Sequence, residues 1–371
     1  MTTPPAARYF QGLLEHAHDL GASDIHIEPL EQGFQVRMRV DGRLRRVAQI
    51  TDDVAFADDV LGTIKAEVFD SALQFRDQAG RCEREHPPAD YRGALFVCKR
   101  GDGLGEKMVL RVLQRDQTFD LASYRMDEVA KRDLVKALGK ANGLIVTSGP
   151  TGSGKSTLLY NAMAALDREQ LAVYTTEDPV EYTLQGLVQG PVDRGRGQTF
   201  AERLRTLMRA DPDVIYVGEI RDQETADVAV HAATTGHLVL TTTHATSVAA
   251  FRHRMTAEWG VSGHLLEETV RWAGSQVLVR TLCPDCRVPD PSGAERLQRV
   301  FGEALEAYRG EGCPSCAGTG ERGRRLLLEW AVRVDQPDGS SVLELQTTLR
   351  DQVRTAVTSG AISVREGLKA I

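Results

Sequence analysis

The spacing of apolar residues divides the chain into two parts with different patterns. Apolar and polar positions alternate in several stretches of residues 1–120, whereas apolar strands and helices follow one another from about Asp120 onward. Alternation is typical of strands with one face in a core, and a strand–helix–strand order is typical of a parallel sheet covered on both faces. The pattern therefore predicts a small N-terminal α+β region followed by a larger α/β region.

The N-terminal region is predicted to be built on an antiparallel sheet. FQVRMRV and RLRRVAQI alternate and are joined by Asp41-Gly42, which is typical of two-residue hairpin turns. ALFVCKR and KMVLRVLQR form a second alternating pair around the glycine-rich GDGLG. ADDVLGTIKAEVF, between the two pairs, has helical spacing.

SDIHIEP alternates in the same way. Ile25 and Ile27 are expected to face the core, and Asp24, His26 and Glu28 are expected to face solvent or a neighbouring subunit. The three polar side chains could in principle present metal ligands on one face. The solvated strand face is the favoured interpretation.

Helices and strands rich in Ile, Val and Leu alternate in the second region. Helices are expected at VAKRDLVKALGKANG, ending at Gly143, and at KSTLLYNAMAAL and FAERLRTLMRA. Strands are expected at GLIVTSG, LAVYTTED, DVIYVGE and HLVLTTT. Because the carboxyl ends of parallel strands share one edge, where ligands bind, side chains that follow these strands are candidates for a site.

A phosphate-binding loop is predicted directly after the first of these strands. GPTGSGKS fits G-x-x-x-x-G-K-[ST] and opens a helix. Backbone N–H groups and the helix N-terminus would bind phosphates, Lys155 would reach the β and γ phosphates of ATP, and Ser156 would bind Mg²⁺. The predicted nucleotide-binding residues are Gly149, Pro150, Thr151, Gly152, Ser153, Gly154, Lys155, Ser156 and Thr157.

Polar residues also follow the other predicted strands. Glu177 ends LAVYTTED, Glu219 ends DVIYVGE, and His244 follows LVLTTT. Glu219 is a candidate to polarise an attacking water, and Glu177 to help with water or Mg²⁺. His244 can sense a γ-phosphate, whereas His237 lies at the opposite end of its strand. A single acidic residue at the end of a strand often only faces solvent. Several such residues at one edge of the sheet favour a functional site.

Composition narrows the function classes. The 371 residues, 42% hydrophobic and 26% charged, are typical of a soluble globular protein with room for two domains. A net charge of −7 argues against a chain whose main partner is nucleic acid. The N-terminus lacks a signal-peptide pattern, and no apolar run approaches the roughly 20 residues that span a bilayer. The chain is therefore expected in the cytoplasm, at a membrane only through partners.

Four of the six cysteines form two pairs, CPDC and CPSC, separated by 26 residues. Four thiolates at this spacing suit a structural, tetrahedral Zn²⁺ site. Reduced cysteines without metal and a redox pair are the less favoured alternatives. The predicted zinc ligands are Cys283, Cys286, Cys313 and Cys316, and Cys82 and Cys98 are interpreted as ordinary small residues.

These motifs, in this order, resemble those of the secretion and type IV pilus ATPases. GPTGSGKST, EDPVEY and TFAERLRTLMRADPDVIYVGEIRDQETADVAVHAATTGHLVLTTTHA resemble that family's Walker A, aspartate-rich, Walker B and histidine boxes. ASDIHIEP, RMRVDGRLRRV and GEKMVLRVL resemble its N-terminal domain, and CPDC with GCPSCAGTGERGR resembles its tetracysteine element. The resemblance covers about residues 15–371.

The resemblance implies a PAS-like domain at 1–120, a linker at 121–127, and a RecA-like ATPase domain at 128–371 with a zinc element at about 280–325. It implies a homo-hexameric motor in which ATP binds between the two domains and neighbouring subunits. Its implied partners are an inner-membrane platform protein and a cytoplasmic docking protein, at the cytoplasmic face of the inner membrane, with no direct nucleic-acid contact.

The resemblance also implies roles for single residues. By position, Glu219 matches the catalytic glutamate, His244 the histidine that couples nucleotide state to conformation, and Lys155 the lysine of the phosphate loop. The remaining implied residues are Glu177 and Glu181 of the acidic box, the motif arginines Arg209 and Arg221, and Arg81 and Arg111, whose counterparts reach a nucleotide.

Gly218 stands where ordinary P-loop enzymes have an aspartate, a difference that the family shares. The sequence departs from the family's own pattern at three places. QAGR replaces the usual Q-D-G-R, with Ala79 in place of the acid, and Gln276-Val277-Leu278 replaces Gln-Arg-Leu. TTTHAT replaces the usual S-T-L-H-T-N. These differences indicate a divergent subfamily or weakened activity.

The favoured function is ATP hydrolysis that powers type IV pilus assembly or type II secretion. The alternatives are a pilus-retraction or DNA-uptake ATPase, a nucleic-acid translocase, and a non-catalytic scaffold that binds nucleotide. Retraction motors of the family are short, like this chain, but lack the tetracysteine element. That element favours assembly or secretion.

Overall fold

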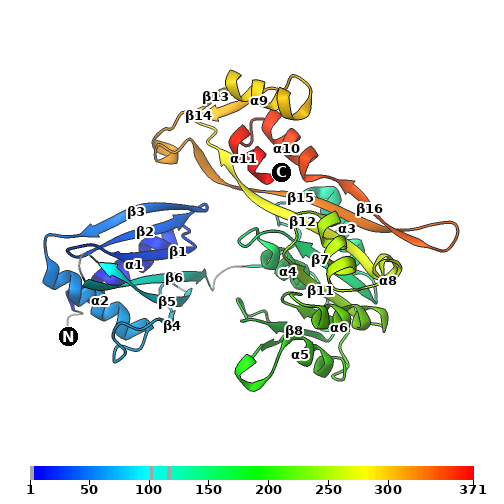
Figure 1. Cartoon of the computed structure of the whole chain (residues 1–371), viewed down its shortest axis with the longest axis horizontal. Helices are drawn as coiled ribbons and strands as arrows, with labels where there is room; N and C mark the ends of the chain where they lie inside the picture. The colour runs from blue at the N-terminus through cyan, green and yellow to red at the C-terminus, as the bar shows by residue number, and fades with distance from the viewer. Residues whose placement is uncertain (1–3, 88, 101–102, 115–117) are drawn as a thin grey trace. The chain divides into compact units, whose positions relative to one another are not determined.

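The computed structural model describes residues 4–87, 89–100, 103–114 and 118–371. The chain forms two compact units, Met1–Thr118 and Phe119–Ile371. Each unit has its own large sheet (Figure 1). The N-terminal unit has one hydrophobic core, and the C-terminal unit has several.

The N-terminal unit is a six-stranded antiparallel sheet with the order β3-β2-β1-β6-β5-β4. One face packs against two helices in a single core. The Asp41-Gly42 turn has φ values of 49° and 77°, as a two-residue hairpin requires, so the predicted hairpin is confirmed. The elements are α1 (Pro5–Asp19), β1 (Asp24–Pro29), β2 (Phe34–Val40), β3 (Arg43–Ile50), α2 (Val54–Val68), β4 (Gln78–Arg84), β5 (Ala89–Arg100) and β6 (Gly103–Gln114).

Strand β1 confirms one part of its prediction and corrects another. Ile25 and Ile27 are each 1% exposed and lie in the core. Asp24 and Glu28 were expected to face solvent or a neighbouring subunit, but within this chain they are already only 8% and 9% exposed. Basic side chains from the neighbouring strands cover them, and ion pairs offset the desolvation of the two carboxylates.

The C-terminal unit is an eight-stranded sheet with the order β16-β15-β12-β7-β11-β10-β8-β9. Neighbouring strands from β12 to β9 are parallel, which confirms the predicted parallel sheet. The last two strands join this sheet as an antiparallel hairpin. The strands are β7 (Gly143–Ser148), β8 (Val173–Glu177), β9 (Val188–Pro191), β10 (Val214–Val217), β11 (Leu238–Thr243), β12 (Val270–Leu282), β15 (Glu321–Asp335) and β16 (Ser341–Thr347).

Helices cover both faces of this sheet, which therefore has two separate cores. Every residue of β7, β10 and β11 is buried. The predicted helices of this region are present with shorter bounds. The helices are α3 (Glu128–Leu138), α4 (Lys155–Ala164), α5 (Phe200–Leu207), α6 (Gln223–Thr234), α7 (Val248–His253) and α8 (Gly263–Thr269).

The prediction that the first of these helices ends at Gly143 was wrong. Helix α3 ends at Leu138, where its apolar spacing stops, and Gly139 caps it. Gly143 instead begins β7 with a φ of 122°. A Cβ at this position would lie 2.5 Å from the Arg271 side chain, so glycine is required by the start of the strand.

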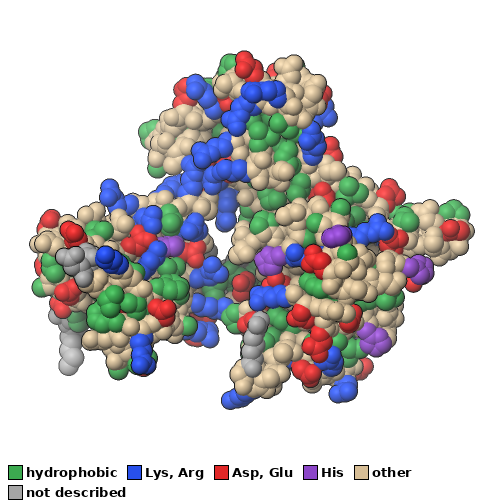
Figure 2. All heavy atoms as spheres, viewed as in Figure 1, with side chains coloured by type: hydrophobic (Ala, Val, Ile, Leu, Met, Phe, Trp, Pro, Cys, Tyr) green, Lys and Arg blue, Asp and Glu red, His purple; other side chains and the backbone are tan. Residues whose placement is uncertain are grey.

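A smaller region with its own core follows β12. Strands β13 (Arg287–Pro289) and β14 (Tyr308–Gly310) pair beside α9 (Pro291–Phe301), and α10 (Leu349–Thr358) and α11 (Val364–Ala370) complete it. Figure 2 shows basic side chains gathered where β12 and β15 run toward this region, and Arg322, Arg324 and Arg325 of β15 are exposed. Among the residues that the structure describes, no helix is long and apolar enough to cross a membrane.

Candidate functional site

The predicted phosphate loop connects β7 to α4, as the motif requires. Gly149, Gly152 and Gly154 have φ values of 142°, 77° and 86°, a region of backbone conformation that favours glycine. The helix begins directly after them, at Lys155. The loop and the first turn of the helix therefore present consecutive backbone N–H groups, which is the arrangement that binds phosphate.

Lys155 is folded back onto the loop that precedes it. Its Nζ donates hydrogen bonds to the carbonyl oxygens of Gly149 at 2.8 Å and Pro150 at 3.1 Å. Burial lowers the pKa of Lys155, and the carboxylates of Glu219 and Glu181 oppose that shift. Two acidic residues that follow different strands therefore act electrostatically on this lysine.

Glu219 lies just beyond β10 and is held at both carboxylate oxygens. His244 Nε2 donates to Oε1 at 2.8 Å, and Arg221 Nε donates to Oε2 at 2.8 Å. Glu219 is 9% exposed. The structure thus brings Glu219 and His244 together, although 24 residues separate them in the sequence.

The backbone around Gly218 extends the sheet and fixes the direction of Glu219. Gly218 N donates to Thr176 O at 2.8 Å, and Thr242 Oγ1 donates to Gly218 O at 2.7 Å. A Cβ on residue 218 would lie 3.2 Å from Thr176 O and 3.5 Å from a ring atom of Phe200. An aspartate has little room there, which accounts physically for the glycine that precedes Glu219.

The carboxylate of Glu177 is buried and hydrogen-bonded inside the protein. It is 3% exposed, accepts hydrogen bonds from Thr175 Oγ1 at 2.7 Å and Gln189 Nε2 at 3.0 Å, and also accepts one from the Tyr160 hydroxyl. Burial and the Glu177 charge raise the pKa of Tyr160. The carboxylate therefore ties α4 to β8 and β9, and Glu181 is the acidic-box residue that acts electrostatically on Lys155.

Sequence reasoning missed the partners of these acids. Tyr160 and Gln189 occupy ordinary helix and strand positions, and no motif marks them. Tyr216 is 2% exposed, and burial raises its pKa, while the Ser156 hydroxyl, the predicted Mg²⁺ ligand, opposes that shift. The identity of such partners depends on which strands become neighbours, so the sequence pattern alone does not reveal them.

Arg81 and Arg111 lie in one row across the N-terminal sheet. Strand register places Arg81 opposite Arg92, Arg92 opposite Arg111, Arg111 opposite Asp24, and Asp24 opposite Arg39. Directly opposite residues point to the same face, so four arginines line one row of the face opposite the helices. Asp24 contacts Arg111 at 3.3 Å and Arg39 at 3.5 Å.

Arg209 lies just past the end of α5 and is exposed. Helix α5 itself is amphipathic, because Leu204 is fully buried while Arg205 pairs with Glu202 and Glu224.

The four predicted zinc ligands converge. Their Sγ atoms all lie within 4.8 Å of one another, with neighbouring separations of 3.7, 3.8 and 3.9 Å. A tetrahedron of sulfurs about 2.3 Å from a zinc ion has edges of about 3.8 Å. Burial acts to raise the pKa of Cys316, but backbone N–H groups of Cys313 and Gly320 outweigh it and lower that pKa to about 6. The tetrad fits a structural zinc ion.

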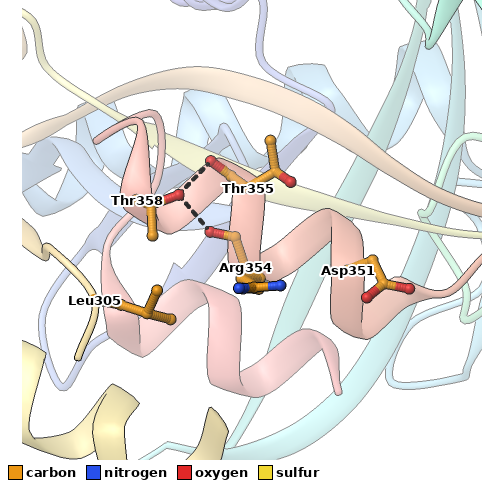
Figure 3. Close-up of a pocket in the computed structure, with 5 residues that line it drawn as sticks. All are labelled: Leu305, Asp351, Arg354, Thr355 and Thr358. Carbon is orange, nitrogen blue, oxygen red and sulfur yellow. Dashed lines mark hydrogen bonds between the residues drawn. The ribbon is translucent and has the colours of Figure 1, made fainter. Parts of the chain in front are cut away.

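A shallow cavity of about 330 Å³ lies elsewhere, beside α10. Figure 3 shows Arg354, Thr355 and Thr358 along the helix, with the Thr358 hydroxyl donating to the backbone carbonyls of Arg354 and Thr355. Leu305 and Asp351 complete the lining. None of these residues belongs to the phosphate loop or the strand ends, so this cavity is separate from the candidate site.

Together, the strand–loop–helix motif and the acidic residues at the carboxyl ends of parallel strands define a P-loop ATPase. The model of the Type II/IV secretion system protein family matches residues 2–371, and the chain belongs to that family. The mixed α/β fold and the family resemblance predicted from the motifs are confirmed.

Known relatives agree with this assignment. The type II secretion system protein E of Dickeya dadantii is 35% identical, over 98% of this chain and 74% of that protein. The type II secretion system ATPase E of Vibrio cholerae is 34% identical, over 99% and 74%. The chain is thus an ATP-hydrolysing enzyme, a motor of the secretion and pilus class, and its family implies ATP and Mg²⁺ as cofactors.

Solved structures share the fold over nearly the whole chain. The Legionella pneumophila ATPase DotB superimposes with a TM-score of 0.73 at 22% identity, covering 100% of this chain and 96% of that one. The pilus retraction motor PilT with bound ADP gives a TM-score of 0.62 at 20% identity, covering 97% and 96%.

Proposed function

We propose that this chain powers type II protein secretion or type IV pilus assembly as a homo-hexamer acting on an inner-membrane platform protein and a cytoplasmic docking protein. The observation that carries the proposal is the arrangement of Glu219, near Lys155 and hydrogen-bonded by His244 and Arg221. The cysteine tetrad and the relatives named type II secretion system protein E support assembly or secretion over retraction.

In this proposal the residues of the sheet edge divide the work of hydrolysis. The N–H groups of residues 149–157 and the Lys155 amino group bind the phosphates. Glu219 orients and polarises the attacking water. His244, bonded to Glu219 in this structure, exchanges that bond when a γ-phosphate is present and so links nucleotide state to α7. Ser156 would hold Mg²⁺, which neutralises charge on the β and γ phosphates.

The assignment extends to the rest of the chain. Residues 1–120 are a PAS-like domain, 121–127 a linker, and 128–371 a RecA-like ATPase domain whose cysteine element binds Zn²⁺. Arg81 and Arg111 bind nucleotide phosphate, and Arg209 is a catalytic residue. Glu177 supports the site through its buried hydrogen bonds, and Glu181 acts on Lys155.

The proposal is tested by Glu219→Gln, which keeps the shape of the side chain but removes the charge that polarises water. The purified variant should bind ATP within about threefold of wild type and hydrolyse it at about 1% of the wild-type rate. The matched control is Glu224→Gln, which removes an exposed carboxylate that pairs with Arg205. Its ATPase rate should stay within twofold of wild type.

The same variants, introduced into the native host, show whether ATP hydrolysis drives secretion, pilus assembly or pilus retraction. Loss of surface fibres or of an exported enzyme with Glu219→Gln, but not with Glu224→Gln, supports the proposal. Fibres that form but fail to retract would assign a retraction motor instead. Unchanged fibres and secretion, or hydrolysis that requires DNA and falls steeply with salt, would contradict the proposal.

A further inference from the structure

Gln276 lies directly against the phosphate loop, although it follows Ser153 by 123 positions in the chain. Its side chain is fully buried, and Nε2 donates a hydrogen bond to Ser153 O at 2.7 Å. Its backbone touches the start of the loop, because a Cβ on Gly149 would lie 2.2 Å from Gln276 O. Gln276 therefore contacts the loop at its first residue and again next to its last glycine.

The register of β12 explains this position. Ser275 pairs with Ser148, the last residue of β7, so Gln276 is the first residue of β12 level with the loop. Ser148 Oγ donates to Gly274 O at 3.0 Å and fastens the two strands just before the loop begins. Position 276 is thus fixed by the sheet and serves as a rigid support for the loop.

The hydrogen bond to Ser153 controls the direction of a donor that faces the phosphate. A trans peptide is planar, so its C=O and the following N–H point in opposite directions. When Nε2 of Gln276 holds the Ser153 carbonyl on the outer side of the loop, the Gly154 N–H must point to the inner side. Inward N–H groups are what a phosphate loop uses to bind its anion.

We propose that Gln276 is a positioning residue that orients the phosphate loop for nucleotide binding. This inference rests on the proposed nucleotide site, since Gln276 acts through Ser153 and Gly154. Within the described residues Gln276 Oε1 has no hydrogen-bond partner, so the bond that this side chain makes is the one to the loop.

The test is Gln276→Met, which keeps an unbranched chain of similar volume but has no donor. Full-length protein is titrated with a fluorescent ADP analogue. The Kd should rise about tenfold, equivalent to about 1.4 kcal/mol. At saturating ATP, kcat should stay within threefold, because Glu219, His244 and Arg221 are unchanged. A role confined to packing would lower the unfolding temperature and leave the Kd unchanged.

The matched control is Thr269→Val, just before the same strand. Thr269 is 3% exposed, and its Oγ1 donates to Leu265 O at 2.6 Å, so the variant removes one buried hydrogen bond away from the loop. Its unfolding temperature should fall as in Gln276→Met, with a Kd within twofold of wild type. If Gln276→Met does not fold, Gln276→Leu replaces it with the same expectation.

Failure of this inference and failure of the nucleotide site give different results. If wild type binds the analogue, Lys155→Ala does not, and the Gln276 variant binds within twofold of wild type, the positioning role is overturned. The role is also overturned if the Kd rises equally in Thr269→Val. If Lys155→Ala binds as tightly as wild type, the nucleotide site itself is misassigned.

Discussion

The two large sheets of this protein place their polar side chains in different ways. In the C-terminal sheet both faces are apolar, and polar groups collect where parallel strands end, at Thr147, Thr176, Glu177, Thr242 and Glu219. In the N-terminal sheet helices cover one face, and the other bears charges in rows that run across the strands. In the parallel sheet, polar side chains therefore lie together at one edge, whereas in the antiparallel sheet charged side chains are distributed over one face.

The difference also decides how visible each surface is in the sequence. In the parallel sheet each polar residue directly follows an apolar run, so the edge can be located before any pairing is known. In the antiparallel sheet the row of Arg81, Arg92, Arg111 and Arg39 comes from four strands. Those residues become one surface only after the register is fixed.

The largest expected effect is at the parallel edge. Lys155→Ala removes the cation that faces the β and γ phosphates, and ATP hydrolysis should fall more than about 100-fold, in line with the loss of a charge-assisted contact in a buried site. Steady-state phosphate release measures it. Lys140→Ala, on an exposed residue after α3, is the control and should stay within twofold. Comparable rates in the two variants would contradict the placement of the site.

The same contrast shows which features of the site can be predicted from the sequence. The phosphate loop, Glu219 and the four cysteines can be recognised from the spacing of residues within short segments. The predicted order of strands and helices then indicates which edge of the sheet the loop and Glu219 share. Gln276, Tyr160 and the row through Arg92 depend on contacts between segments far apart in the chain. Local pattern predicts an element and its burial, whereas the partner of a buried polar group is set by tertiary packing.

Helix ends show a related limit. The apolar spacing of α3 predicted its existence, and the error was confined to its end at Leu138. Asp24 and Glu28 show the opposite case, in which the strand was predicted but the burial of its charges was not. Burial of a charge depends on ion-pair partners on neighbouring strands, and the sequence of one strand does not contain them.

The next largest effect concerns the region that β12 leads into. Cys313→Ser with Cys316→Ser removes two of four thiolates, and metal affinity that couples to folding should be lost. Zinc should fall from one per chain to none by metal analysis, and the unfolding temperature should drop by about 5–10 °C, given about 2–4 °C per kcal/mol in a unit of this size. Cys98→Ser is the control, with full zinc content. Zinc retained in the double variant, or absent from wild type, would refute the metal assignment.

A moderate effect is expected on the antiparallel face. Arg81→Ala with Arg111→Ala removes two cations proposed to bind phosphate, and KM for ATP should rise about tenfold, the size of one charge-assisted hydrogen bond. Arg46→Ala, on an exposed residue of β3, is the control. If the two variants had the same KM for ATP, the proposal that Arg81 and Arg111 bind nucleotide phosphate would be wrong.

The smallest effect concerns the charges buried within that face. Burial opposes ionisation of Glu28, but hydrogen bonds from Arg37 and Lys107 outweigh it and lower the pKa of Glu28 from 4.5 to about 2. A folded-state pKa below the unfolded value means that ionised Glu28 stabilises the fold above about pH 4.5. That contribution is lost as pH falls from about 4.5 to about 2.

Glu28→Gln therefore separates a buried ion pair from an exposed one in the same sheet. It should destabilise the N-terminal unit by about 1–2 kcal/mol at pH 7, since the amide keeps one acceptor but not the charge. Glu83→Gln breaks a pair whose side chains are 58% and 53% exposed and should cost less than about 0.5 kcal/mol. Hydrogen exchange of β1 peptides in the full chain measures both. The two variants should converge as pH falls toward 2, because wild-type Glu28 then loses its charge as well, and a difference that persists there would mean that packing rather than charge holds this face.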